Sequence, residues 1–380
     1  MRILHTSDWH LGRQFHNVSL LEDQRHVLEQ ITTLIAEQQI DVVLLCGDIY
    51  DRSVPPAAAV QLLDDVLFHI SSTLNVPVIM ISGNHDGAER LGFAARQLEK
   101  SGIYIRTALD HIDQSITLKD QHGEVDFYCI PYSDPVSVRD VFNVDVRSHD
   151  EAMAVMVDRV RAKFRDDVRR VLLSHCYVEE GQASDSERPL SLGGAEQVRI
   201  EHFNPFHYAA LGHLHAPQHK THRHIRYSGS ILKYSFSEVR QKKSVTIVSL
   251  DEDGQCTTEQ HDLIPKRDMR IIEGYFEEIL AGAEQDPRRD DYLLIRILDR
   301  HAILDVMAKL RRLYPNVLHV ERPAFSQQDA HQVRRQAAMQ SGEVAMFADF
   351  YQQMTGESWQ EGECQFVTDV LQQIYQGEKR

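Results

Sequence analysis

Short apolar runs alternate with longer amphipathic segments over the first two thirds of the chain. Five of these runs are apolar without strict alternation, which is typical of strands buried on both faces: residues 2–5, 41–46, 77–81, 171–173 and 208–211. Segments 20–38 and 56–70 carry apolar residues at helical spacing and predict helices that cover these strands. Strands that alternate with helices indicate an α/β fold.

The pattern changes after residue 243. Residues 244–250, with the turn at 251–254, predict an antiparallel hairpin that closes the first domain. A strand at 292–298, a helix at 302–313 and a strand at 317–320 predict a small α+β capping domain, and apolar residues at helical spacing beyond residue 342 predict a helical hairpin. We therefore expect three parts, at 1–265, 266–325 and 340–380.

Composition limits the classes of function. The chain is 42% hydrophobic and 26% charged, as ordinary folded proteins are. Its net charge of −16 argues against a protein that coats nucleic acid by bulk electrostatics, so a polyanionic substrate would need a local positive centre. No apolar run approaches the roughly 20 residues of a membrane helix, and the five cysteines form no CxxC pair. We expect a cytoplasmic protein with reduced thiols.

Each of the five predicted strands is followed at once by potential metal ligands. These are Asp8 and His10, Asp48, Asn84 within Gly83-Asn84-His85-Asp86, His175, and the pair His213 and His215. Because loops at the carboxyl ends of strands can converge while the sheet holds them rigid, we expect these side chains to form one cluster.

Imidazole, carboxylate and carboxamide ligands without thiolate suit Mn²⁺, Fe²⁺ or Zn²⁺. A shared carboxylate such as Asp48 could bridge two ions, and two ions can activate water and neutralise charge on a phosphate. Any one of these motifs alone would more often cap a helix or brace a loop. The occurrence of all five motifs, each directly after a predicted strand, favours a metal site.

Two residues of the Gly83-Asn84-His85-Asp86 motif have open roles. His85 could donate a proton to a leaving group, or it could be a loop histidine that bonds a carbonyl. We expect Asp86 to orient a histidine or to close the turn, and not to bind metal.

These motifs resemble the signature of the calcineurin-like metallophosphoesterases. The segments HTSDWHLG, GDIYDRSVPP, GNHD, YAALGHLH and YSGSILKYSFSE more closely resemble the SbcD family, the Mre-type nuclease subunits of bacterial SbcCD complexes. The resemblance covers the whole chain and is sharpest over residues 1–240. It implies two facing mixed β-sheets flanked by helices, followed by the capping domain and the C-terminal hairpin.

The resemblance also implies roles for the site residues. One metal would be held by Asp8, His10, Asp48 and His215, and the other by Asp48, Asn84, His175 and His213. Manganese would be the active metal and His85 the general acid. The implied activity is DNA hydrolysis, as a 3′–5′ double-strand exonuclease and as an endonuclease on hairpins or blocked ends, in DNA repair and recombination. Some relatives carry a histidine where this chain has Asp51, which leaves the role of Asp51 open.

Three partners are implied: DNA, an SbcC-like SMC-type ATPase gripped by the C-terminal helices, and a second copy of the chain. The resemblance places the homodimer contact in helices at roughly 56–100, whereas the apolar stripe Val60, Leu63, Leu67 and Ile70 is by spacing alone more typical of a core face. Two basic groups could contact phosphates or could simply be solvated: Lys220, Arg223 and Arg226, and Arg240, Lys242 and Lys243.

Two other functions remain open from the sequence. A stand-alone phosphoesterase acting on nucleotides or phosphomonoesters could use the same two ions, because such chemistry sets the bond and not the substrate. A scaffold that docks an ATPase onto DNA would keep the site only for structure. The complete ligand set argues against the scaffold, and the capping domain and tail argue against a compact phosphatase.

Overall fold

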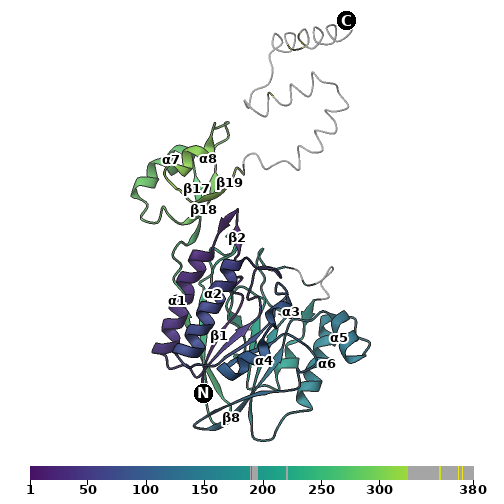
Figure 1. Ribbon diagram of the computed structural model, residues 1–380. Coiled ribbons are helices and arrows are strands. Elements are labelled where there is room, and N and C mark those ends of the chain that lie inside the picture. The colour runs from purple at the N-terminus through teal and green to yellow at the C-terminus, as the bar shows by residue number, and fades with distance from the viewer. Residues whose placement is uncertain are drawn as a thin grey trace. The chain divides into compact units, whose positions relative to one another are not determined.

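The computed structural model describes residues 1–188, 190, 196–219 and 221–323, with the single positions 351, 367 and 370. The chain divides into two compact units, Met1–Asp268 and Met269–Arg380 (Figure 1). Among the predicted parts, the helical hairpin at 340–380 lies outside the described residues apart from those three positions.

The first sheet of unit 1 has four parallel strands and two antiparallel strands at one edge. Their order is β16-β15-β1-β4-β5-β6. The bounds are β1 Arg2–Thr6, β4 Val42–Cys46, β5 Val78–Ile81, β6 Ile103–Arg106, β15 Ser244–Leu250 and β16 Cys256–Asp262. The predicted strands at 2–5, 41–46 and 77–81 and the closing hairpin are therefore present.

The second sheet also has four parallel strands, but it has one antiparallel strand at each edge. Its order is β13-β14-β12-β9-β8-β7. The bounds are β7 Ile116–Asp120, β8 Gly123–Ile130, β9 Arg169–His175, β12 Tyr208–Gly212, β13 Gln218–His219 and β14 Ile225–Tyr227. Two short pairs lie outside both sheets: β2 Gln14–Phe15 with β3 Val18–Ser19, and β10 Tyr177–Val178 with β11 Gln197–Val198.

The two sheets face each other across a shared apolar core. Alternate residues of β4, among them Val42 and Leu44, belong to one buried cluster with Phe127 of β8 and Leu173 of β9. The other residues of β4, such as Val43, are also buried. Both faces of this strand are therefore covered, which explains its unbroken apolar sequence.

The helices cover the outer faces of the sheets. Helices α1 (Leu21–Glu37) and α2 (Ala57–Phe68) lie side by side, and a π-helical turn at His69–Thr73 extends α2 (Figure 1). On the second sheet, α6 (His149–Arg161) packs on a cluster that includes Leu172 and Leu211. The remaining helices of unit 1 are short: α3 Ala88–Leu91, α4 Ala95–Leu98 and α5 Pro135–Phe142, with 3₁₀ turns at Glu99–Ser101, Ile200–Phe203 and Phe236–Glu238.

Unit 2 contains a parallel three-stranded sheet with its own core. The element order is β17 Met269–Gly274, α7 Phe276–Gly282, a 3₁₀ turn Ala283–Gln285, β18 Tyr292–Ile297, α8 Val306–Arg311 and β19 Val317–Glu321. The predicted helix at 302–313 is shorter, because the preceding Asp305 has a left-handed φ of 54° and starts the helix at residue 306. Strand β17 and helix α7 were missing from the prediction, since β17 is only partly buried and lacks an apolar run.

In the part of the chain that the structure describes, no helix combines the length and apolar character needed to cross a membrane.

Candidate metal centre

All seven predicted ligands meet where the carboxyl ends of the two sheets come together. Strands β1, β4 and β5 of the first sheet are followed within three residues by Asp8, Asp48 and Asn84. In the second sheet His175 ends β9, and β12 is followed by His213. The cluster is therefore built from both sheets, with His10 and His215 added from the same loops.

Glycine is required where the two sheets touch. A Cβ on Gly212 would lie 1.8 Å from the carbonyl oxygen of Cys46, and one on Gly47 would lie 2.3 Å from Nδ1 of His175. These contacts are far below the closest approach of real Cβ atoms. The glycines thus allow the strand ends to approach closely enough for ligands from two sheets to converge.

The first ligand group consists of Asp8, His10 and His215, all buried. One ligand atom from each lies within 4.8 Å of the others, and the Nε2 atoms of His10 and His215 are 3.1 Å apart. The Asp8 carboxylate also accepts the backbone N–H of His213 at 3.1 Å, which ties the β1 loop to the β12 loop.

The second group centres on Asn84, His175 and His213. The Asn84 Oδ1 lies 3.0 Å from Nε2 of His175 and 3.3 Å from Nδ1 of His213. The backbone carbonyl of Cys46 lies 2.9 Å from the other ring nitrogen of His175, which fixes this ring.

Asp48 joins the two groups. Its Oδ2 lies 3.6 Å from Nε2 of His10 and 3.6 Å from Nε2 of His175, while its Oδ1 accepts the backbone N–H of His85 at 2.8 Å. One carboxylate oxygen therefore faces ligands of both groups, as a bridging ligand must.

The electrostatics of the cluster fit divalent cations. Burial and the neighbouring Asp48 carboxylate raise the pKa of Asp8 well above its usual value. Burial and the nearby histidine rings lower the pKa of His10 and of His213, so that these rings are neutral. Divalent cations bound here would offset the repulsion between the carboxylates and would be coordinated by the neutral imidazoles.

His85 lies beside the cluster with its ring held in place. Its Nδ1 donates to the backbone carbonyl of Asp51 at 2.8 Å, and its Nε2 lies 3.9 Å from Oδ2 of Asp48. The carbonyl bond expected of a loop histidine is thus present, and it leaves Nε2 directed toward the centre. His10, Asp51 and His85 also form a third group with ligand atoms within 4.8 Å of one another.

Asp86 closes the turn and does not orient a histidine. Its carboxylate accepts the backbone N–H groups of Ile49, Tyr50 and Gly83, at 2.9 to 3.1 Å. Burial and the Asp48 charge raise the pKa of Asp86 to about 7. Of the two predicted roles, the structure shows turn closure.

Several supporting residues could not be predicted from the sequence. Buried Gln24 on α1 donates to the carbonyls of Trp9 and His10, which braces the loop that carries two ligands. Ser186 and Glu238 contact Nδ1 of His215. Neither position has a local pattern that distinguishes it from an ordinary polar residue, although Glu238 ends the YSGSILKYSFSE segment.

The basic groups are only partly available to a substrate. Arg226 and Lys243 are buried, and Lys243 pairs with Glu238 at 2.6 Å, so neither of the two roles left open, phosphate contact or solvation, fits these two side chains. Arg223, Arg240 and Lys242 are exposed. Lys220 lies outside the described residues.

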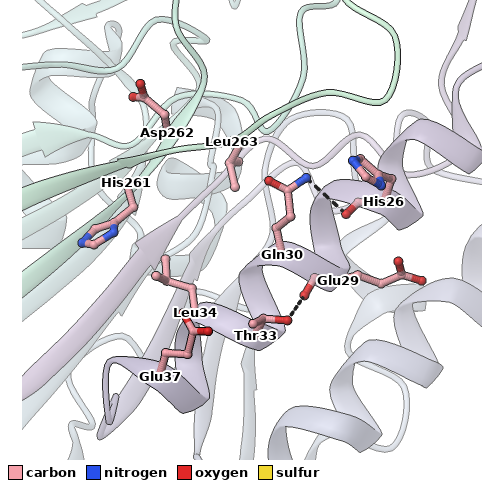
Figure 2. Close-up of a pocket in the computed structure, with 9 residues that line it drawn as sticks. All are labelled: His26, Glu29, Gln30, Thr33, Leu34, Glu37, His261, Asp262 and Leu263. Carbon is pink, nitrogen blue, oxygen red and sulfur yellow. Dashed lines mark hydrogen bonds between the residues drawn. The ribbon is translucent and has the colours of Figure 1, made fainter.

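A surface groove of about 370 Å³ lies away from the cluster. Figure 2 shows it between α1 and the end of β16, lined by His26, Glu29, Gln30, Thr33, Leu34, Glu37, His261, Asp262 and Leu263. None of the predicted site residues lines this groove, so it is not part of the metal centre.

Comparisons with known proteins match both parts of the chain. Residues 1–217 match the calcineurin-like phosphoesterase family model, and residues 265–355 match the model described as type 5 capsule protein repressor C-terminal domain. The SbcD subunit of the nuclease SbcCD from Staphylococcus epidermidis is 34% identical over 361 residues, which cover 94% of each chain.

Two solved structures are also similar. One is the protein TT1561 of Thermus thermophilus, with a TM-score of 0.41 and 13% identity over 68% of this chain and 98% of that one. The other is a dimetal phosphatase from Danio rerio, with a TM-score of 0.42 and 12% identity over 70% of this chain and 96% of that one.

Proposed function

Because this chain belongs to the calcineurin-like phosphoesterase family, and within it to the SbcD family of nuclease subunits, we propose that it hydrolyses DNA phosphodiesters with manganese. The observation that carries the proposal is the pair of ligand groups joined by Asp48, with His85 beside them. As the nuclease subunit of an SbcCD-type complex it would act as a 3′–5′ exonuclease on duplex ends and as an endonuclease on hairpins or blocked ends.

The ligand set fits two divalent ions. Asp8, His10, Asp48 and His215 would hold one ion, and Asp48, Asn84, His175 and His213 the other. Bound there, the ions would supply a hydroxide at neutral pH and positive charge at a phosphate. The positive charge of these ions would offset the repulsion between DNA and a chain whose net charge is −16.

His85 would act as the general acid on the leaving oxygen. The Asp51 carbonyl holds the Nδ1–H, so a second proton on Nε2 faces the centre and can pass to the leaving group.

Partner binding is proposed in two places. The C-terminal segment at 340–380 would bind an SbcC-like ATPase, an idea supported by the family match over 265–355. A homodimer would form through helices at roughly 56–100. Leu63, Leu67 and Ile70 are buried inside unit 1, as a core stripe would be, whereas Val60, Phe68 and Phe93 are exposed and could form the contact. A nuclease of this kind would work in the cytoplasm, at the nucleoid.

The test uses the purified chain, with and without its ATPase partner, on a hairpin-ended duplex. We expect manganese-dependent cleavage that falls by about 10² to 10⁴ in His85→Ala, which is what a general acid contributes. In a p-nitrophenyl phosphodiester of thymidine, the leaving group needs no proton. His85→Ala should therefore cleave this substrate nearly as fast as the wild type.

No cleavage of any DNA, together with brisk hydrolysis of nucleotides or phosphomonoesters, would refute the nuclease proposal and leave the metal centre standing. An equal loss of activity on both substrates in His85→Ala would show that His85 is not the general acid.

A further inference from the structure

His215 is held differently from the other histidine ligands. The second ring nitrogen of His175 meets a backbone carbonyl, whereas Nδ1 of His215 meets two side chains from distant segments. Ser186 Oγ lies 2.6 Å from this nitrogen and Glu238 Oε1 lies 3.3 Å from it. The Ser186 hydroxyl also donates to Glu238, so the three groups form one chain of hydrogen bonds.

A buried ion pair closes this chain. Glu238 and Lys243 are almost wholly removed from solvent, with exposed fractions of 0% and 5%, and their charged groups are 2.6 Å apart. The Lys243 ammonium also lies 2.9 Å from the carbonyl oxygen of His215 and 2.9 Å from Oγ of Ser230. Lys243 thus contacts both the backbone of His215 and the Glu238 carboxylate, which lies beside the His215 ring.

The direction of the hydrogen bonds fixes the protonation of the His215 ring. An ionised Glu238 can only accept, so Ser186 must donate to it and must then accept from Nδ1–H of His215. With its proton on Nδ1, the ring presents a bare Nε2. That nitrogen is the one 3.1 Å from Nε2 of His10, in the first ligand group.

We propose that Ser186, Glu238 and Lys243 form a positioning device that sets the affinity of the first ion, held by Asp8, His10, Asp48 and His215, independently of the affinity for the second. The inference rests on the proposed metal centre. Carboxylates behind histidine ligands typically contribute about 10- to 100-fold in metal affinity by fixing tautomer and ring orientation. In the second group, by contrast, the ring nitrogen of His175 that faces away from Asn84 contacts the backbone carbonyl of Cys46 and not a carboxylate.

The experiment titrates the metal-free full chain with Mn²⁺ by calorimetry. We expect Glu238→Gln to bind one of the two ions about 10- to 100-fold less tightly while the affinity for the other ion is unchanged. Electron paramagnetic resonance should then show an uncoupled Mn²⁺ signal at one ion per chain, where the wild type gives a coupled pair. Ser186→Ala should have a smaller effect, because Glu238 still lies 3.3 Å from the ring.

Two controls separate positioning from folding. Glu238→Gln leaves the buried Lys243 ammonium without its carboxylate partner, so the double variant Glu238→Gln/Lys243→Met removes the whole ion pair and should recover thermal stability without recovering the affinity for the first ion. Asp120→Asn removes a buried carboxylate that pairs with Arg169 at 2.6 Å, away from the site, and should bind both ions normally.

Native affinity for both ions in Glu238→Gln would overturn the proposal. Equal weakening of both ions, restored in the double variant, would also overturn it and assign the pair to folding alone. A wild-type chain that binds fewer than two Mn²⁺ ions would instead refute the metal centre on which the inference rests.

Discussion

At the scale of single residues, four of the seven proposed ligands hold a backbone conformation that side chains rarely adopt. Asp8, His10, Asp48 and His213 have φ values of 52°, 46°, 50° and 108°. Such conformations cost of order 1–3 kcal/mol each and persist where the surrounding structure enforces them. Here the enforcement is visible, because the backbone N–H of Asp8 and that of His10 donate to the carbonyls of Gly47 and Asp48. The loops are therefore set before any ion binds.

Asp48 is the residue whose loss should affect both ions. Asp48→Asn keeps the size of the side chain and removes the negative charge that faces His10 and His175. We expect affinity for Mn²⁺ to fall by at least about 100-fold at both sites, the upper end of what even supporting residues contribute. Calorimetric titration of the metal-free protein with Mn²⁺ measures both affinities. Loss of only one ion would show that Asp48 does not bridge.

Asp120 provides a test of pH dependence away from the centre. Burial opposes ionisation of Asp120, but the bidentate hydrogen bonds from Arg169, the N-terminal ammonium of Met1 and the backbone N–H of His122 together outweigh burial and hold the pKa of Asp120 well below its usual value. A lowered pKa stabilises the fold above about pH 4, where the unfolded aspartate is ionised, and this contribution disappears as the pH falls toward the folded pKa.

We therefore expect Asp120→Asn to lower the free energy of unfolding by about 1.5–3 kcal/mol at pH 7, as for hydrogen bonds to charged groups. The difference from wild type should shrink below pH 4. Urea unfolding of the metal-free proteins between pH 3 and 7 measures it. A difference that stays constant over that range would contradict the assigned role of the charge.

At the scale of elements, the ends of strands β4 and β12 decide whether the site can exist. Gly212→Ala would place a methyl group 1.8 Å from the Cys46 carbonyl, so the two sheets would have to separate. We expect a loss of about 1–3 kcal/mol or more of stability from this overpacking, with weaker Mn²⁺ binding. Gly282→Ala is the matched control, since nothing lies within 4 Å of its added Cβ. Unchanged metal binding in Gly212→Ala would contradict the tight approach.

The elements also show what a sequence can and cannot reveal. The strand before Asp48 was predictable, because a fully buried strand needs an unbroken apolar run and the ligand follows it at once. Glu238 was not, since its contact with His215 depends on chain paths that only tertiary packing defines. Lys243 was expected either to contact phosphate or to be solvated because a lysine is normally exposed, and its buried partner cannot be read from spacing.

The division of the five strands between two sheets was equally invisible in the apolar runs themselves. Strands β5 and β12 are both buried throughout but lie in different sheets. The pairing of strands is a long-range property. The arrangement of two facing sheets came from the family resemblance and is confirmed by the structure.

At the scale of the whole molecule, the metal centre joins two sheets that also meet through the apolar core and through the His5 ring, which contacts the Tyr208 hydroxyl and the Leu211 carbonyl. Ions bound by Asp48 of the first sheet and His175 of the second would stabilise the folded form by mass action. At 100 times the dissociation constant the gain is about 2.7 kcal/mol per ion. We expect excess chelator to lower the melting temperature of the wild type and to leave that of Asp48→Asn almost unchanged. Identical shifts in both would contradict the link.

Every proposed ligand lies in unit 1, and the described part of unit 2 has a separate core formed by residues such as Phe276, Leu293 and Leu310. A chain ending at Asp268 should therefore fold, bind two Mn²⁺ ions and hydrolyse bis(p-nitrophenyl) phosphate at the rate of the full chain. Steady-state kinetics and calorimetry on the two proteins test it. A truncated chain that folds but binds no metal would show that unit 2 completes the site.

The strand order of the first sheet also fixes when during synthesis the enzyme becomes active. Strand β1 leaves the ribosome first, yet one of its two neighbours, β15, begins only at Ser244. Two ligands, His213 and His215, and the carboxylate of Glu238 also come late. A chain terminated before these residues lacks several proposed ligands and the antiparallel neighbour of its first strand. Only a chain synthesised through the whole of unit 1 therefore contains the complete proposed metal centre.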